Sequence, residues 1–184
     1  MRVYDVIIVG AGPIGIELAV ALKRAGVDYA QIEAGSVGQT LTWWAPQTRF
    51  FSSPERIAIA GVPLVGVAQE KATREEYLAY LRAVVEQFDL EIAQHERVTS
   101  IEPSGDAESR LFTLGTQWRG GTRRGPARRI VPAIRAMPPP KMPGSPGEEL
   151  PHPPPYFVAS PRPFLQPAPT SAPHHSAPPP PAPT

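Results

Sequence analysis

The chain has 184 residues, of which 26 are proline and none is cysteine, and its formal net charge is +1. Without cysteine the chain has no disulfide, thiolate metal site or dithiol redox pair of its own, so any redox reaction requires a cofactor. No apolar run approaches the ~20 residues of a membrane-spanning helix. The N-terminus does not have the pattern of a secretion signal, because the charged residue Asp5 interrupts its first apolar run. We therefore expect a cytoplasmic protein without a membrane partner.

Proline and charge divide the chain into two parts. Of the 26 prolines, 21 lie in the last 59 residues. Residues 1–114 carry 10 Lys and Arg against 15 Asp and Glu, whereas residues 115–184 carry 8 against 2. This asymmetry predicts a folded domain over residues 1–135. A loop segment over residues 136–166 and a disordered Pro/Ala-rich tail over residues 167–184 are expected to follow it.

A glycine motif follows the first apolar run. Residues 6–9 are β-branched and apolar, which predicts a strand buried on both faces of a parallel sheet. The next residues have the spacing G-x-G-x-x-G. Gly10 allows a tight turn, Gly12 lets the backbone approach a pyrophosphate, and Gly15 permits close packing of a helix on the strand.

A helix, a strand and an acid complete this unit. Pro13 suits the first helical turn, and apolar residues at helical spacing extend the helix to a stop at Gly26. Residues 29–32 predict a second strand, which ends at Glu33, where such folds place a carboxylate on a ribose hydroxyl. The helix N-terminus attracts phosphate. We interpret residues 6–33 as a dinucleotide site; the alternative is a βαβ unit whose glycines only form a turn.

Residues 34–66 predict a long loop with four aromatic residues, Trp43, Trp44, Phe50 and Phe51. Packing beneath the loop is the favoured interpretation of these rings. The functional alternative is a cover for a flat ring system, with hydrogen-bonding groups from Gln39, Thr40, Ser52 and Ser53.

The following elements continue an α/β pattern. Thr73 and Glu76 predict a capping box for a helix that runs to Phe88, and residues 90–93 predict a short strand after it. Further short strands are expected over residues 98–101, 111–114 and 117–119, forming an antiparallel excursion. The chain then returns to the parallel sheet at residues 129–131. The expected fold class is an α/β Rossmann-type domain.

Five arginines form a basic run, namely Arg119, Arg123, Arg124, Arg128 and Arg129. A solvated hairpin face is favoured over a nucleic-acid site, because few aromatic residues are interleaved and the first part of the chain is acidic. Further on, His174 and His175 are interpreted as solvated rather than as metal ligands. The tail has the P-x-x-P spacing of ligands for aromatic grooves.

Together, GAGPIG, Glu33, TRFFSSPERI, REEYLAYLR and PGEELPH resemble the FAD-dependent, thioredoxin-reductase-like pyridine nucleotide oxidoreductases, most of all their bacillithiol-disulfide reductase branch. The resemblance is good over residues 4–114, fades to about residue 166 and then vanishes, so we interpret residues 136–166 as a degraded, family-like loop segment. It implies FAD in a first Rossmann unit, NADPH in a second one, and hydride passage from nicotinamide through flavin to a disulfide or another small electron acceptor. It also implies a possible homodimer.

The resemblance also assigns roles to residues. The glycine motif would hold the pyrophosphate, Glu33 the adenosine ribose and Val98 the adenine, while Gln39 and Thr40 would approach the flavin. The candidate cofactor-binding residues are Gly10, Gly12, Pro13, Ile14, Gly15, Glu33, Gln39, Thr40, Ser52 and Val98. No catalytic residue and no metal ligand is assigned.

Three departures from the family pattern lead to a further hypothesis. Ile14 stands where the branch has a cysteine, which excludes thiol exchange there. Pro132 and Arg135 fall where the returning strand and its glycine turn are expected, so we expect Pro132 to break the strand. The NADPH unit and the C-terminal flavin segment have no counterpart. We hypothesise a truncated N-terminal part of a flavoenzyme, inactive alone; the alternatives are a single-site NAD(P)-binding protein and an interaction protein with a Pro-rich tail.

Overall fold

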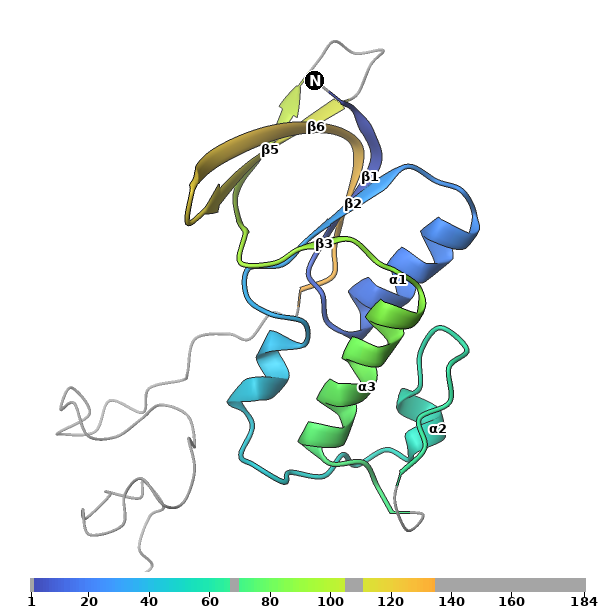
Figure 1. Ribbon diagram of the computed structural model, residues 1–184. Coiled ribbons are helices and arrows are strands. Elements are labelled where there is room, and N and C mark those ends of the chain that lie inside the picture. Colours follow the sequence, from blue (N-terminus) through green and yellow to red (C-terminus); the bar gives the residue numbers. More distant parts are fainter. Residues whose placement is uncertain (1, 67–69, 105–110, 135–184) are drawn as a thin grey trace, which may run out of the picture. The chain divides into compact units, whose positions relative to one another are not determined.

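Six strands form one sheet in the order β3-β2-β1-β6-β5-β4 (Figure 1). The computed structural model describes residues 2–66, 70–104 and 111–134, which belong to one unit, Met1–Met137. The parallel part comprises β1 (Tyr4–Val9), β2 (Tyr29–Ile32), β3 (Ile92–Ala93) and the end of β6 (Gly121–Pro132). This arrangement confirms the predicted Rossmann-type α/β class.

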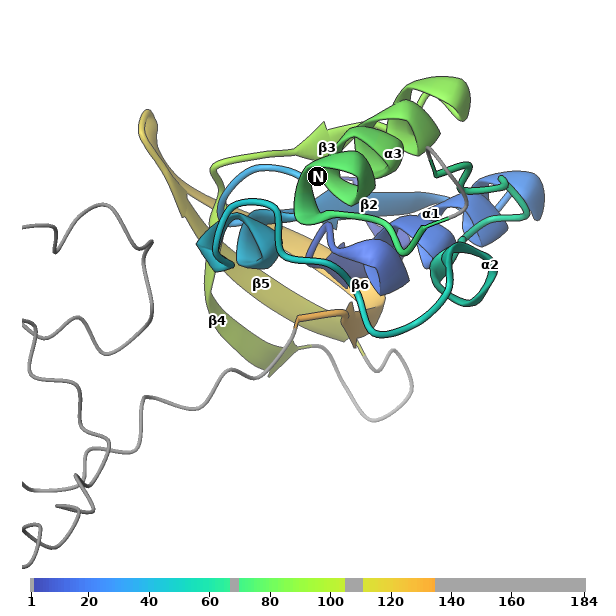
Figure 2. The ribbon, with the colours of Figure 1, turned by 90° about the horizontal axis from the view of Figure 1, so that it is seen from below.

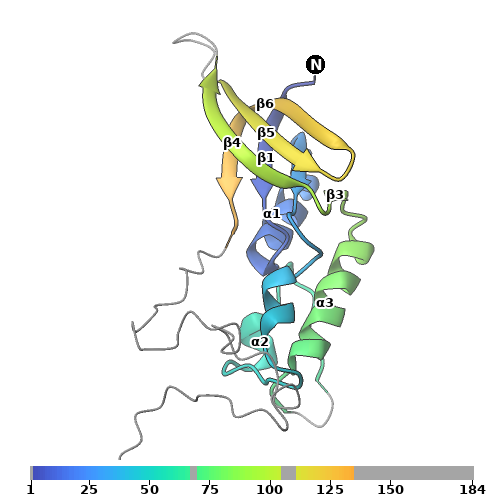
Figure 3. The same ribbon diagram turned by 90° about the vertical axis from the view of Figure 1, so that its left-hand side faces the viewer.

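The antiparallel excursion consists of β4 (Arg97–Ser104), β5 (Leu111–Trp118) and the first half of β6. Strand β6 arches, so that its beginning pairs with β5 and its end pairs with β1 (Figure 1). Figure 3 shows β4 and β5 side by side in this arched part. The prediction of a separate strand over residues 117–119 is wrong, because residues 117 and 118 continue β5 as far as its turn.

Helices cover one face of the parallel strands. Helix α1 (Pro13–Arg24) lies beside α3 (Arg74–Gln87) (Figures 1 and 2), and the short elements η1 (Gln39–Trp43) and α2 (Pro54–Ile57) lie in the connection between β2 and α3. Neighbouring side chains of a strand point to opposite faces. Accordingly, Ile8 belongs to the core cluster with the helices, and Ile7 to a second cluster that includes Leu114 of β5 and Ala127 of β6. Strand β1 is therefore buried on both faces, as predicted.

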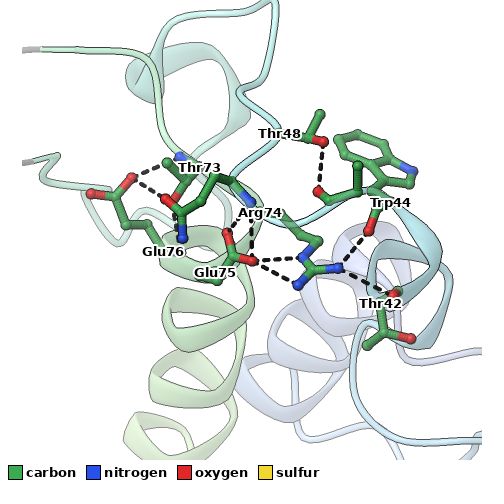
Figure 4. Close-up of polar contacts among 9 residues, drawn as sticks. Thr42, Trp44, Thr48, Thr73, Arg74, Glu75 and Glu76 are labelled. Carbon is green, nitrogen blue, oxygen red and sulfur yellow. Dashed lines mark hydrogen bonds and ion pairs between the residues drawn. The ribbon is translucent and has the colours of Figure 1, made fainter. Parts of the chain in front are cut away.

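Helix α3 begins with the predicted capping box. The Thr73 hydroxyl accepts from the Glu76 N–H, and the Glu76 carboxylate accepts from the Thr73 N–H (Figure 4). Arg74, in the first turn, pairs with Glu75 and donates to the backbone carbonyls of Thr42 and Trp44. The end of η1 is thereby held against the start of α3.

The four aromatic residues of the long loop divide into two pairs. Trp44 and Phe50 pack on the main core cluster, with ring centroids 5.0 Å apart. The prediction of packing beneath the loop is correct for this pair. Trp43 is 54% exposed and Phe51 is 96% exposed, so packing beneath the loop does not account for the Phe51 ring.

Pro132 does not break the returning strand, contrary to the expectation from the sequence. Strand β6 continues to Pro132, which pairs with Val9, and the next N–H, that of Ala133, donates to the Val9 carbonyl at 2.8 Å. Successive N–H groups of a strand alternate between its two sides. The missing donor of Pro132 therefore faces away from β1, where the described part of β5 no longer pairs with β6.

The five arginines of the basic run are all exposed, as expected of a solvated face. Arg123 lies 3.7 Å from a carboxylate oxygen of Glu96, and Arg128 lies 3.4 Å from one of Asp5. No helix in the described part of the chain is long and apolar enough to cross a membrane. The expectations for Arg135, His174, His175, the loop segment and the tail fall outside the described residues.

Candidate dinucleotide-binding site

The glycine turn lies at the carboxyl end of β1, between that strand and α1. Gly10 has φ +116°, a conformation that other residues rarely adopt. A β-carbon on Gly10 would also lie 2.7 Å from the Ala133 carbonyl oxygen. The end of β6 thus passes directly beside the turn, so glycine is required here by both conformation and contact.

Gly15 and Gly12 are glycines for different reasons. A β-carbon on Gly15 would lie 2.2 Å from the Gly10 carbonyl oxygen, so the protein itself excludes any larger residue. A β-carbon on Gly12 would have no neighbour within 4 Å, and the Gly12 backbone is extended, with φ −79°. Nothing in the described protein requires glycine at position 12, whereas close approach of a ligand to this backbone would require it.

The N-terminus of α1 is open to an anion. Gly12 caps the helix without a side-chain hydrogen bond, the first turn contains no acidic residue, and the last turn carries Lys23 and Arg24. Within the described residues, the N–H groups of Gly12, Ile14 and Gly15 donate to no acceptor. Free N–H groups and the helix dipole together favour negative charge at this end. Ile14 is 66% exposed beside them.

Residues 10 and 11 are held by four hydrogen bonds. The Gly10 N–H donates to the Ile32 carbonyl at 2.7 Å, and the Ala11 carbonyl accepts from the Gly38 N–H at 3.0 Å. Two side chains complete the set: Gln31 donates from Nε2 to the Gly10 carbonyl at 2.9 Å, and Glu33 accepts from the Ala11 N–H at 2.7 Å. The turn is therefore fixed before any ligand binds.

The Glu33 carboxylate retains acceptor capacity. One oxygen accepts from the Ala11 N–H at 2.7 Å and the other from the Gly35 N–H at 2.8 Å. An ionised carboxylate has about four acceptor positions. Partly buried Glu33 can thus hold the turn and still accept from the hydroxyls of a ribose.

The remaining candidate residues lie in different surroundings. Gln39 accepts from the N–H and the hydroxyl of Ser36 and donates to Thr42, so its amide organises its own loop. Thr40 is partly buried in the same 3-10 helix, η1. Ser52 is exposed in the loop before α2, and Val98 of β4 packs against the second core cluster.

The structure therefore brings together the glycine turn, Pro13, Ile14 and Glu33. Gln39 lies beside Gly35, because a β-carbon on Gly35 would be 2.6 Å from the Gln39 side chain. Among the described residues, no hydrogen bond joins Ser52 or Val98 to the turn. The roles of Gln39, Thr40, Ser52 and Val98 toward a cofactor remain predictions.

Sequence reasoning missed three residues of the site. Gln31 had a visible signal, since it is the one amide among the apolar residues of β2. Gly38 has φ +71°, and its β-carbon would lie 2.8 Å from Leu78, a contact that only the folded structure reveals. Glu96 is 7% exposed, donates its N–H to the Glu33 carbonyl and accepts from the Thr116 hydroxyl. Its burial results from β4–β5 pairing and has no local signal.

The sheet order, the glycine turn and the acid after β2 define a Rossmann-type dinucleotide-binding domain. The family model described as pyridine nucleotide-disulphide oxidoreductase matches residues 7–165. The chain belongs to this family of flavoproteins.

Individual relatives agree with this assignment. Bacilliredoxin reductase Bdr of Bacillus subtilis (strain 168) is 37% identical over 79 residues, which are 43% of this chain and 24% of that protein. The structure of bacillithiol disulfide reductase Bdr from Bacillus cereus is 31% identical with a TM-score of 0.73, covering 82% of this chain and 45% of that one.

The structure of the Staphylococcus aureus reductase of the same name is 28% identical with a TM-score of 0.65, covering 73% of this chain and 39% of that one. The predicted resemblance to the bacillithiol-disulfide reductase branch is confirmed by these matches. The chain spans less than half the length of each of these relatives.

Proposed function

We propose that the glycine turn binds the pyrophosphate of FAD, and that the chain serves NAD(P)H-dependent reduction of a small electron acceptor. The observation that carries this proposal is the bare N-terminus of α1. The N–H groups of Gly12, Ile14 and Gly15 face no acceptor in the described protein, and the space beside Gly12 is open. A diphosphate supplies the charge and the acceptors that such a helix end favours.

Glu33 selects among dinucleotides. Its carboxylate accepts from ribose hydroxyls, whereas a phosphate on the ribose 2′ oxygen would place like charges together. This geometry favours FAD or NAD over NADP at the turn. The family membership and the resemblance to bacillithiol disulfide reductases favour FAD over NAD.

FAD, when bound, would supply the hydride and electron transfer that the side chains of this chain do not provide. The protein groups would bind and orient the cofactor: the α1 N-terminus would hold the phosphates and Glu33 the ribose. Because the chain has no cysteine, none of its 184 residues can form a mixed disulfide with a substrate. An acceptor, including a disulfide such as the one named for the Bdr relatives, would therefore take electrons without a thiol of this chain.

Visible absorbance and calorimetry test the proposal. The purified chain is expected to carry flavin absorbance near stoichiometric amounts, or to bind added FAD, while NADP⁺ binds at least tenfold more weakly to the ligand-free protein. Tight binding of NAD⁺ without binding of FAD would replace the proposal with a single-site NAD-binding protein. Binding of neither nucleotide by folded protein would overturn it.

A further inference from the structure

One peptide bond of the glycine turn is held at both of its polar ends by two side chains, Gln31 of β2 and Glu33, which directly follows β2. The carbonyl of the Gly10–Ala11 peptide accepts from Gln31 Nε2 at 2.9 Å, and the N–H of the same peptide donates to Glu33 Oε2 at 2.7 Å. Gln31 and Glu33 are two positions apart, which is the spacing of side chains on one face of a strand. The peptide cannot rotate without breaking both bonds.

Folding alone does not explain an amide at position 31. Gln31 is 2% exposed, and it lies between Ala30 and Ile32 in a parallel strand. Its Oε1 atom is buried and has no hydrogen-bond partner among the described residues. A buried, unsatisfied oxygen lowers stability. An apolar side chain of similar size would avoid that cost but would leave the buried Gly10 carbonyl without this donor, so the role of the amide lies in the bond that its other end makes.

We propose that Gln31 is a positioning residue for dinucleotide binding, acting with Glu33 as a clamp on the Gly10–Ala11 peptide. This inference rests on the proposed function of the turn. The clamp fixes the peptide that directly precedes the Ala11–Gly12 peptide, and so restricts the direction of the free N–H groups of Gly12, Ile14 and Gly15. Donors that are already oriented bind an anion without the entropic cost of ordering the loop. The role differs from that of Glu33, which also offers acceptors to the ribose.

Two substitutions in the full chain separate the hydrogen bond from the volume of the side chain. Gln31→Met keeps the length but removes the donor, and we expect FAD to bind about tenfold more weakly. Gln31→Glu keeps the shape of the side chain, but burial favours its neutral carboxyl, so FAD affinity should fall further as the pH rises and the carboxyl ionises against the Gly10 carbonyl oxygen. Tyr80→Phe is the matched control, because Tyr80 is buried and hydrogen-bonded to residues 59 and 62, away from the turn. It should lower the melting temperature but leave FAD affinity unchanged.

Amide hydrogen exchange of the ligand-free protein gives a readout that does not require FAD. In Gln31→Met, exchange should accelerate over residues 10–12 while α3 keeps its protection; in Tyr80→Phe, the turn should keep its protection. Unchanged local exchange in Gln31→Met, or FAD affinity equal to that of the unsubstituted chain, would overturn the clamp. If the unsubstituted chain binds no FAD, the proposed function fails, and the exchange measurement still decides whether the clamp exists.

Discussion

At the scale of single residues, the motif G-x-G-x-x-G contains two kinds of glycine. Gly10 and Gly15 are fixed by the protein, because their β-carbons would lie 2.7 Å and 2.2 Å from backbone oxygens. Gly12 has open space at its β-carbon position, and its backbone conformation suits any residue. Folding therefore requires glycine at positions 10 and 15, whereas glycine at position 12 is accounted for by the proposed binding of a dinucleotide.

This difference predicts that one added methyl group mainly weakens FAD binding at position 12 and mainly lowers stability at position 15. Gly12→Ala should cost no more than about 1 kcal/mol of stability, the usual cost of alanine at a helix N-cap, and reduce FAD affinity at least tenfold, because the methyl group enters the space of the phosphates. Gly15→Ala should cost about 1–3 kcal/mol through overpacking. Denaturant unfolding of the ligand-free variants and FAD titration would measure both. Equal losses of stability in the two variants would refute the distinction.

At the scale of elements, β6 joins the parallel part of the sheet to its antiparallel part. Its first half is antiparallel to β5 and its second half is parallel to β1. The expectation that Pro132 breaks this strand was physically reasonable for a strand with partners on both sides. It was wrong because only one side of β6 is paired at that point among the described residues. Sequence alone does not show which side of a strand lacks a neighbour.

Two separate variants test this explanation, one that removes Pro132 and one that adds a proline at position 131. Pro132→Leu should change the free energy of unfolding by less than about 0.5 kcal/mol. In Val131→Pro the lost donor is one that faces β1, since the N–H of Ala133, two residues later, donates to Val9. That variant should lose at least about 2 kcal/mol, because a carbonyl of β1 loses its partner. Urea unfolding of both variants gives the comparison, and a large effect of Pro132→Leu would contradict it.

At the scale of the whole molecule, two tyrosines of α3 fasten the preceding loop to the core. Tyr77 donates to the Ile57 carbonyl at 2.8 Å and packs against the ring of Phe50, and Tyr80 donates to the Val62 carbonyl at 2.7 Å. Burial, and to a lesser extent Tyr80 and Glu17, raises the pKa of Tyr77 to about 12. The neutral phenol is therefore favoured in the folded protein.

The raised pKa predicts a loss of stability in alkali. Unfolded tyrosine titrates near 10, so the contribution of Tyr77 is complete below about pH 10 and is lost as the pH rises toward 12. Tyr77→Phe should be less stable at neutral pH but should lose less stability between pH 10 and 12. Unfolding measured across this range would show the converging curves. Burial also raises the pKa of Tyr29, which adds to the loss of stability with pH in both proteins. Parallel curves for the two proteins would mean that Tyr77 does not contribute to the loss of stability in alkali.

The sequence predicted what depends on local patterns. The glycine turn, the capping box of α3, strand β2 and the return to the parallel sheet at residues 129–131 are all confirmed. Features that depend on distant pairing were not accessible. Gln31 meets Gly10 only because β2 lies beside β1, and Glu96 is buried only because β4 pairs with β5. The exposed Phe51 also differs from its packed neighbour for reasons of loop path rather than composition.

The pairing of β1 with β6 has a consequence for the order of events during synthesis. Tyr4 meets Ala127, a partner about 120 residues later in the chain. At roughly 5–20 residues per second, the ribosome delivers that partner about 6–24 seconds after the first strand. Until then one edge of β1, the strand that leads into the glycine turn, has no neighbour. Nascent chains of this family member thus pass through a period in which one edge of the apolar strand β1 is unpaired and prone to aggregation. The speed of translation limits how soon that exposure ends.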